Sequence, residues 1–396
     1  MSNSVSRSFS KDNFKTAAEL EKGVDELCDL MESIYASGHY PKVTVERSWS
    51  EHNPVIGGEL ADPCAYRWYL RRESKRLLND GATIRIEPSR TILPLNDPHV
   101  LDHADEDNWD FTQKKLFLFS AERIDLSVNR LEHYTGTKAQ DFQRYILFTN
   151  YAMHIEVFLE KYPDCVKPSR EGVQMPAYHH KLDDNSGLTI VNIGVGPSNA
   201  KTITDHVAVL RPDAMVMVGH CGGLRNHQEI GDFVLASGYM RDDGVLDELL
   251  PTSIPIAPNY LLNLYLREAM GEFDLSYRLG TVYTTANRNW EFSKKRTVER
   301  IHQSRSIAVD MESATVAANG FRYRIPNATL LCISDKPLHG KPKLSAAAQS
   351  FYQNSKEMHL ELVIKAIEKV KSDYPNGLPN SSIRAFDEPI LGGGDS

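Results

Sequence analysis

The chain lacks several features that would assign it to a specialised class of proteins. None of its apolar runs approaches the ~18 residues of a membrane span, and its start, MSNSVSRSFSKDNFK, has no apolar core of a signal peptide. The five cysteines are scattered, odd in number and without a CxxC pair, which predicts free thiols in a reducing cytoplasm. A net charge of -8 disfavours general nucleic-acid binding.

A hydrophobic content of 41% and a charged content of 25% predict a folded protein with room for one large or two ordinary domains. Residues 1–140 predict a small α+β domain, and residues 375–396 predict an irregular tail rich in Pro, Gly and Ser. Within the small domain we expect helices at Phe14–Tyr35, Ala65–Leu78 and Arg123–Tyr134, strands at Tyr40–Trp49, Ala82–Ile86 and Thr91–Leu95, and an acidic loop at His99–Asp110.

Residues 141–374 have a different rhythm, in which apolar strands alternate with helices. Strands are predicted at Tyr145–Thr149, Leu188–Ile193, Met215–Val218, Phe233–Ala236, Leu279–Thr284, Ser306–Val309 and Thr329–Ile333. Helices are predicted at Ala200–Leu210, Asn259–Met270, Glu312–Tyr323 and Leu344–Lys371. This alternation predicts an α/β fold with a mainly parallel, mixed sheet sandwiched by helices.

Two carboxylates follow two of these strands. Glu312 lies where the strand ending at Val309 turns into a helix of small residues, and Asp335 follows the strand Thr329–Ile333. Ligands of open α/β sheets bind beyond the carboxyl ends of the strands, so both acids are predicted to face one pocket. Two carboxyls in different environments suit glycosidic bond cleavage. Each acid alone is also explained as a helix-terminus or turn residue.

Two glycine-rich strand ends precede the acids. Gly194-Val195-Gly196-Pro197-Ser198-Asn199 opens a helix and matches neither a Rossmann fingerprint nor a P-loop, so the alternative is an ordinary turn with a polar helix cap. Gly219-His220-Cys221-Gly222-Gly223 ends the next strand and predicts a backbone-lined concavity. A Cys221 nucleophile with His220 as its base is disfavoured, because adjacent residues of a strand point to opposite faces.

These motifs resemble the purine nucleoside phosphorylase and nucleosidase superfamily, and in particular its AMP-specific nucleosidase branch. The resemblance covers most of residues 130–370. It is carried by HYTGT (133–137), YILFTNY (145–151), QMPAYH (174–179), the segment 189–251, TTANRNWE (284–291), AVDMESAT (308–315) and LLCISDKPLHGKPKL (330–344). The small domain resembles that branch more weakly, through YPKVTVE, AYRWYL and ATIRIEPS.

The resemblance implies hydrolysis of AMP to adenine and ribose 5-phosphate without a cofactor or a metal. It implies that Asp335 protonates N7 of the base and that Glu312 and Met311 hold the ribose. The ribose side would be lined by Gly194, Gly196, Pro197, Ser198 and the backbone of His220, Cys221, Gly222 and Gly223. Asn289 and Trp290 would lie near the base, and Asn150 and Tyr151 where relatives place water or phosphate. It also implies a homo-oligomer, most simply a hexamer, with no nucleic-acid or membrane partner.

Some expectations stay open at this point. A purine phosphorylase and a non-catalytic AMP sensor remain alternatives. Thioadenosine-cleaving relatives carry an arginine where this chain has Leu331, and glutamates where it reads AMHIEV, which leaves water activation by Glu156 unsupported. A 5′-phosphate needs bidentate cations, and Arg67 is favoured because it lies within AYRWYL. The full set of basic candidates is Arg67, Arg71, Arg241, Arg288 and Lys336.

Overall fold

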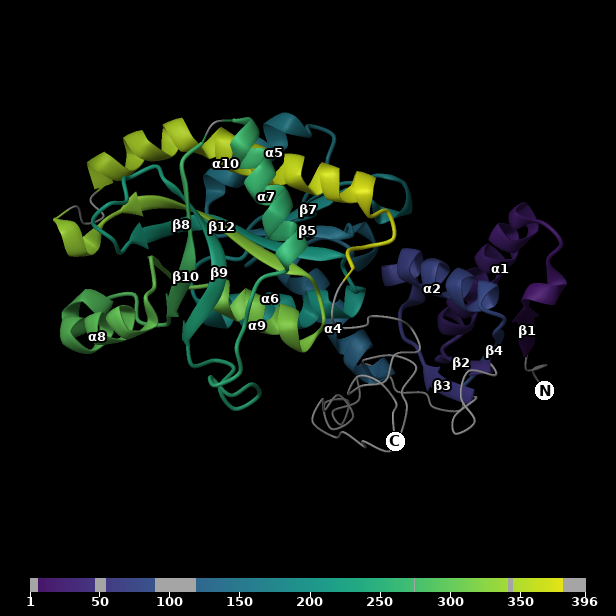
Figure 1. Ribbon diagram of the computed structural model, residues 1–396. Helices are drawn as coiled ribbons and strands as arrows, with labels where there is room; N and C mark the ends of the chain where they lie inside the picture. The colour runs from purple at the N-terminus through teal and green to yellow at the C-terminus, as the bar shows by residue number, and fades with distance from the viewer. Residues whose placement is uncertain (1–5, 47–54, 90–118, 274, 341–344, 380–396) are drawn as a thin grey trace. The chain divides into compact units, whose positions relative to one another are not determined.

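A computed structural model describes residues 6–46, 55–89, 119–273, 275–340 and 345–379 (Figure 1). They form two compact units. The small unit contains the described residues up to Leu131 together with Val209–Arg211, and the large unit contains Glu132–Ala208 and the described residues from Pro212 on. The predicted domain boundary at residue 140 falls shortly after this division. The predicted strand Thr91–Leu95, the predicted loop His99–Asp110 and most of the predicted tail lie outside the described residues.

The small unit contains a four-stranded antiparallel sheet with the strand order β1-β4-β2-β3. Its strands are β1 (Arg7–Ser10), β2 (Pro41–Glu46), β3 (Val55–Glu59) and β4 (Thr83–Pro88). Helices α1 (Ala17–Ala36) and α2 (Arg67–Asn79) pack on each other and on β4. The apolar residues of α1 recur at helical spacing and are buried, so the periodicity predicted this helix correctly. Strands β1 and β3 were not predicted.

The large unit is built on an eight-stranded mixed sheet with the order β11-β10-β9-β12-β8-β5-β7-β6. Its strands are β5 (Tyr145–Thr149), β6 (Ala177–His180), β7 (Leu188–Asn192), β8 (Ala214–Gly223), β9 (Phe233–Asp242), β10 (Tyr277–Thr285), β11 (Ala308–Asp310) and β12 (Asn327–Asp335). All seven predicted strands are present, and β6 is an additional one.

The sheet is less uniform in direction than an open parallel sheet. Strands β12, β8, β5 and β7 run parallel to one another, and so do β9, β10 and β11, but β9 and β12 are antiparallel. In addition, β11 pairs with β8, which closes β8, β12, β9, β10 and β11 into a small barrel. The barrel places β11 beside β8 and antiparallel to it. Glu312, two residues after β11, therefore lies near the end of β8.

Helices cover both faces of the sheet. Helices α5 (Ala152–Lys161), α7 (Tyr260–Glu272) and α10 (Ser345–Asp373) lie on one face, and α6 (Pro197–Val207) and α9 (Ser313–Arg322) lie on the other (Figure 1). Two further helices are α4 (Ala121–Thr135) and α8 (Lys294–Ser304). None of the helices in the described part of the chain is long and apolar enough to cross a membrane.

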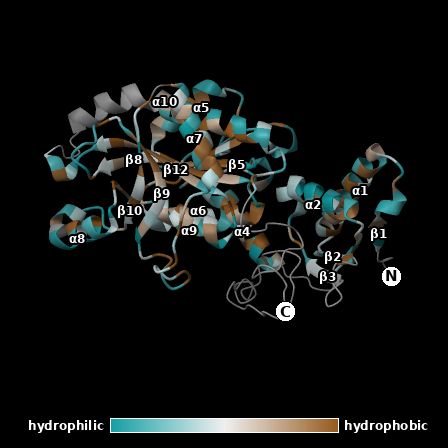
Figure 2. Ribbon diagram, in the orientation of Figure 1, coloured by the Kyte–Doolittle hydropathy of each residue, from teal (hydrophilic) through white to brown (hydrophobic). Residues whose placement is uncertain are grey.

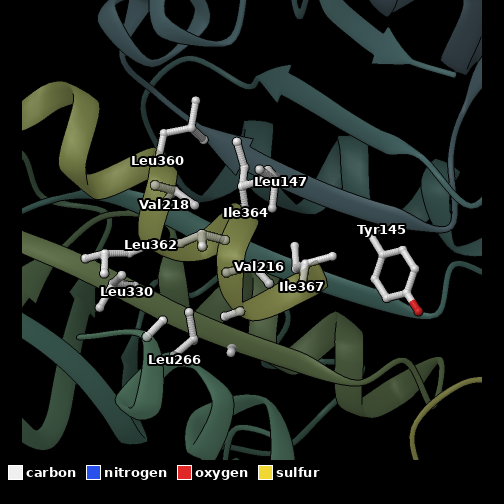
Figure 3. Close-up of a cluster of buried hydrophobic side chains, with 14 of the residues drawn as sticks. Tyr145, Leu147, Val216, Val218, Leu266, Leu330, Leu360, Leu362, Ile364 and Ile367 are labelled. Carbon is white, nitrogen blue, oxygen red and sulfur yellow. The ribbon is translucent and has the colours of Figure 1, made fainter. Parts of the chain in front are cut away.

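The main core lies between the sheet and the layer of α5, α7 and α10. Val216, Val218 and Leu330 from the strands meet Leu266 of α7 and Ile364 of α10, and all five are at most 2% exposed (Figure 3). Figure 2 shows brown, apolar residues along the central strands, whereas α8 is mostly teal. Burial of this size fixes the strands, and the residues at their ends are therefore held on a rigid frame.

Candidate active site

Glu312 is held between two strand ends that are distant in the sequence. It is the residue before α9, and its side chain is 2% exposed. One carboxylate oxygen accepts the backbone N–H of Gly196 at 2.6 Å, and the other accepts Nδ2 of Asn150 at 3.1 Å. These contacts join the end of β5, the turn after β7 and the start of α9. The carboxylate is thus fixed in position before any ligand binds.

A second buried acid controls the charge of Glu312. Burial raises the pKa of Glu312, and the negative charge of Asp310 raises it further, to about 8. Asp310 is buried too, but it accepts hydrogen bonds from Thr284 Oγ1 at 2.6 Å, from the Ser313 backbone N–H at 2.9 Å and from the Ser313 hydroxyl. Burial raises the pKa of Asp310 above its ordinary value, and these donors oppose that shift because they favour the charged form. The position of Asp310, two residues before Glu312, is the signal in the sequence that could have identified this partner.

Asp335 is the last residue of β12. This strand pairs with one edge of β8, and β11, which precedes Glu312, pairs with the other edge. Gly222 of β8 pairs with Asp335 on one side and with Val309 of β11 on the other. Since neighbouring strands lie about 4.8 Å apart, the backbones of Val309 and Asp335 are about 10 Å apart. One nucleotide spans that separation. The structure therefore supports a shared site for the two acids. Asp335 is half-buried, and Oδ1 accepts the hydroxyl of Ser334 at 2.7 Å.

Two glycines make this convergence feasible. A Cβ on Gly222 would lie 3.0 Å from Cγ1 of Val309 and 3.3 Å from Cδ of Pro337, so both side chains would have to shift by a few tenths of an ångström to accept it. Gly196 has a φ of 111°, a backbone conformation that favours glycine, and this conformation presents its N–H to Glu312. Gly194, also at positive φ, and the buried Pro197 shape the same turn, and Ser198 is exposed at the first turn of α6.

His220 and Cys221 lie on opposite faces of β8, as expected for neighbours on a strand. Cys221 packs in an apolar cluster with Val234, Leu331 and Ile333. The ring of His220 instead contacts Tyr151, with ring centroids 4.4 Å apart. This arrangement confirms that the two side chains do not form a nucleophile–base pair. Gly223, like Gly222, is buried at the end of β8.

The loop after β10 carries the residues predicted to lie near the base. Arg288 and Asn289 are exposed, whereas Trp290 is buried against Leu224 and Tyr283. Among the described residues, Arg288 forms no ion pair. Met311, next to Glu312, is half-buried.

The remaining basic candidates have partners within the protein. Arg67 of α2 forms ion pairs with Glu32 at 2.6 Å and with Asp29 at 2.8 Å, both on α1. Lys336 is 3% exposed, and its Nζ donates to the Asn226 carbonyl at 2.9 Å. Buried Arg241 donates to the Leu250 carbonyl at 2.7 Å. Arg71 pairs with acids of α1 as well. These contacts favour structural roles for the four side chains, Arg67 included.

Taken together, the site offers a buried carboxyl fixed by backbone and amide donors and a second carboxyl at the end of β12, on the other side of β8. Glycine-rich turns let a ligand approach the backbone between them. Such an arrangement suits an acid-assisted cleavage in which one carboxyl binds the sugar and the other protonates the leaving group.

The fold and this site define a member of the phosphorylase superfamily. Residues 146–368 match the family described as the phosphorylase superfamily, and this match covers more than half of the chain. The mixed sheet, its two helical layers and the acids at strand ends on either side of β8 agree with that match.

Individual relatives narrow the class further. The chain is 38% identical to the AMP nucleosidase of Escherichia coli K12, and the alignment covers 88% of each protein. A crystal structure of AMP nucleosidase from Bacteroides thetaiotaomicron is 30% identical, covers 64% of this chain and 100% of that one, and has a TM-score of 0.55. A Campylobacter jejuni 5′-methylthioadenosine/S-adenosylhomocysteine nucleosidase, 22% identical over 57% of this chain and 99% of its own with a TM-score of 0.50, supports the fold alone. The chain belongs to the AMP nucleosidase family, which confirms the resemblance drawn from its motifs.

Proposed function

We propose that this protein hydrolyses the N-glycosidic bond of AMP and releases adenine and ribose 5-phosphate. The observation that carries the proposal is the 38% identity to an AMP nucleosidase across 88% of both chains. The fixed carboxyl of Glu312 beside the strand end that bears Asp335 supplies the chemistry that such a reaction needs. A binding protein without activity would have no need for two acids in these positions.

In the proposed mechanism, Asp335 donates a proton to N7 of adenine while the bond between the base and C1′ breaks. The base then leaves as a neutral species, and positive charge develops on the ribose ring. Ionised Glu312 accepts hydrogen bonds from ribose hydroxyls, and its negative charge stabilises the oxocarbenium-like sugar. A water oxygen then bonds to C1′ and the water loses a proton, and proton return to the Asp335 carboxylate restores the acid for the next turnover. The backbones of Gly194, Gly196 and Gly222 give the ribose room between the acids.

The 5′-phosphate is proposed to bind Arg288. This side chain is exposed in the loop after β10, and arginine matches the geometry of a phosphate dianion. The sequence analysis favoured Arg67, but its guanidinium is already neutralised by carboxylates of α1.

A homo-oligomer, most simply a hexamer, and a cytoplasmic location are further parts of the proposal. The large unit exposes Tyr260, Leu279 and Phe292 by 72%, 60% and 89%, and such apolar side chains are suited to subunit contacts. All five cysteines are free, which suits a reducing compartment. Sedimentation equilibrium measures the mass of the assembly, and division by the 44.7 kDa of one chain gives the number of subunits. A fully active monomer would contradict the proposed oligomer.

The experiment that tests the function compares substrates and phosphate dependence. The protein is incubated with AMP, adenosine and methylthioadenosine, with and without inorganic phosphate, and the sugar product is identified. We expect adenine and ribose 5-phosphate from AMP without added phosphate. Release only in the presence of phosphate, with a sugar 1-phosphate as product, would assign a phosphorylase. No release from any substrate would favour the AMP sensor.

A further inference from the structure

We propose that His154, His220 and His359 form a binding site for a divalent transition-metal ion of the zinc class. His154 lies in the first turn of α5, His220 near the end of β8, and His359 on α10. Their ligand-capable nitrogen atoms all lie within 4.8 Å of one another. The proposal concerns a site on the α5–α10 face of the sheet, and it does not depend on the proposed hydrolysis of AMP.

Hydrogen bonds orient two of the three rings in the manner of metal ligands. Nδ1 of His154 lies 2.7 Å from Oγ1 of Thr149, and Nε2 of His359 lies 2.9 Å from the Leu330 carbonyl. A carbonyl can only accept, so Nε2 of His359 carries the proton and Nδ1 keeps its lone pair. A metal-bound histidine commonly uses its second ring nitrogen in this way, because the bond fixes both the tautomer and the ring.

The other nitrogen of each of these two rings is buried without a hydrogen-bond partner. His154 and His359 are both 0% exposed, and His154 Nε2 and His359 Nδ1 have no hydrogen bond to any described residue. A buried polar atom left in this state costs free energy, which a bound cation would recover. This observation and the proximity of the rings together point to a ligand bound between the three histidines.

The protonation states are those that metal binding requires. Burial lowers the pKa of His359 to about 4 and the pKa of His154 well below its ordinary value. Both rings are therefore neutral near pH 7, and neutral imidazole is the form that binds metal.

The geometry needs only a small contraction to bind an ion. An equilateral triangle with sides of 4.8 Å has its centre about 2.8 Å from each corner, whereas a Zn–N bond is about 2.0–2.1 Å long. Ring movements of less than about 1 Å would close this difference. The ring planes of His154 and His220 differ by 3°, and His359 stands nearly perpendicular to both.

The donor set selects the kind of ion. Within the described residues, this group of potential ligands contains three imidazoles and no carboxylate or thiol. Neutral nitrogen donors suit Zn²⁺, Ni²⁺ or Cu²⁺, whereas Mg²⁺ and Ca²⁺ prefer oxygen. The bound ion would tie α5, β8 and α10 together. The metal site would lie next to Tyr151, whose ring contacts His220. The residue before Tyr151 is Asn150, which donates a hydrogen bond to Glu312.

Metal content tests the proposal directly. The full chain without a polyhistidine tag is freed of metal with a chelator, incubated with Zn²⁺, desalted and analysed for bound zinc. We expect one Zn²⁺ per chain and a Tm about 5 °C higher at a 100-fold excess over Kd. In His154→Gln and in His359→Gln, the Kd for Zn²⁺ should rise at least ~100-fold. His302→Gln, which removes an exposed histidine of α8, is the matched control and should bind as the wild type does.

A second measurement covers variants that fail to fold. Co²⁺ bound to the wild-type chain should show the visible absorption of a low-coordinate nitrogen site, and Zn²⁺ should displace it. Zinc content equal in wild type and both variants would show adventitious binding elsewhere and would overturn the proposal. So would a wild-type chain that binds no stoichiometric Zn²⁺, which would leave the three rings as an aromatic part of the core. Neither outcome would affect the assignment of AMP hydrolysis.

Discussion

At the scale of single residues, Asp335 and Glu312 are assigned different tasks. Asp335 is half-buried at a strand end, while Glu312 is fixed by Asn150 and Gly196. Replacing Asp335 by Asn removes the proton donor and keeps the shape of the side chain. We expect Asp335→Asn to lower kcat by ~10²–10⁴ with little change in AMP binding. Steady-state kinetics and equilibrium dialysis measure the two effects. Exposed Asp164→Asn is the control, and a near-normal kcat in Asp335→Asn would remove it from the acid role.

The pH dependence follows from the raised pKa of Glu312. Its ionised form predominates only above about pH 8, so kcat/KM should increase with pH up to that range. The free energy of unfolding changes with pH in the opposite direction. A folded-state pKa above the ordinary 4.5 means that the protonated carboxyl favours folding below pH 4.5, and this contribution is lost as the pH rises through about 8.

The charge of Asp310 provides a specific check of that profile. Asp310→Asn keeps an oxygen that can accept from Ser313 but removes the negative charge beside Glu312. The pKa of Glu312 should fall, and the rise of kcat/KM should move to lower pH. An unchanged profile in a folded Asp310→Asn variant would show that Glu312 does not control the reaction.

Recognition of the phosphate is assigned to one arginine. Arg288→Ala should cost AMP ~2–4 kcal/mol in kcat/KM, a factor of roughly 30 to 1,000, and leave adenosine nearly unchanged. Arg67→Ala removes the same charge from the small unit and is the matched control. A selective loss for AMP in Arg67→Ala, with none in Arg288→Ala, would reverse the assignment.

At the scale of elements, seven apolar runs in the large unit were predicted to be strands, and all seven are strands in the structure. The ends of β8 and β9 were missed, because GHCGG and GYMRD carry no apolar alternation. The strand β6, with the sequence AYHH, is too short and polar to be recognised. The closure of β11 on β8 was also invisible, since antiparallel pairing across the barrel leaves no mark on either strand.

Contacts between residues that are far apart in the sequence also limited how much of the site could be predicted. Glu312, Asp335 and the glycine turns carried local signals from which a shared pocket was predicted, whereas the hydrogen bond from Asn150 to Glu312 joins residues 162 positions apart. The three buried histidines come from three separate elements, so no spacing rule could have grouped them.

The packing of strand ends around Gly222 gives a prediction for this scale. In Gly222→Ala, the new Cβ would lie 3.0 Å from Cγ1 of Val309, closer than ordinary van der Waals contact, so Val309 would have to shift. We expect a loss of about 1 kcal/mol or more in stability, seen as a Tm lower by ~2–4 °C, and a larger fractional loss of kcat/KM. Gly271→Ala on α7 is the control, because nothing lies within 4 Å of its Cβ. Equal Tm and activity in the two variants would contradict the close approach.

At the scale of the whole molecule, the account rests on one enzyme activity in a protein of two compact units. The large unit holds the acids, the glycine turns and Arg288. The identity to the Escherichia coli relative extends over 88% of the chain, so it includes residues of both units. This extent supports an AMP-specific enzyme more strongly than the superfamily fold does, because that fold is shared by nucleosidases and phosphorylases alike.

The measurement that tests the central claim most directly follows the oxygen atom that ends on the sugar. AMP is turned over in water enriched in oxygen-18, in the absence of phosphate, and the products are identified by mass spectrometry. Hydrolysis predicts adenine and ribose 5-phosphate that carries one label from water, formed at a rate that Asp335→Asn reduces. Unlabelled sugar product, or a requirement for phosphate with a sugar 1-phosphate as product, would contradict the account.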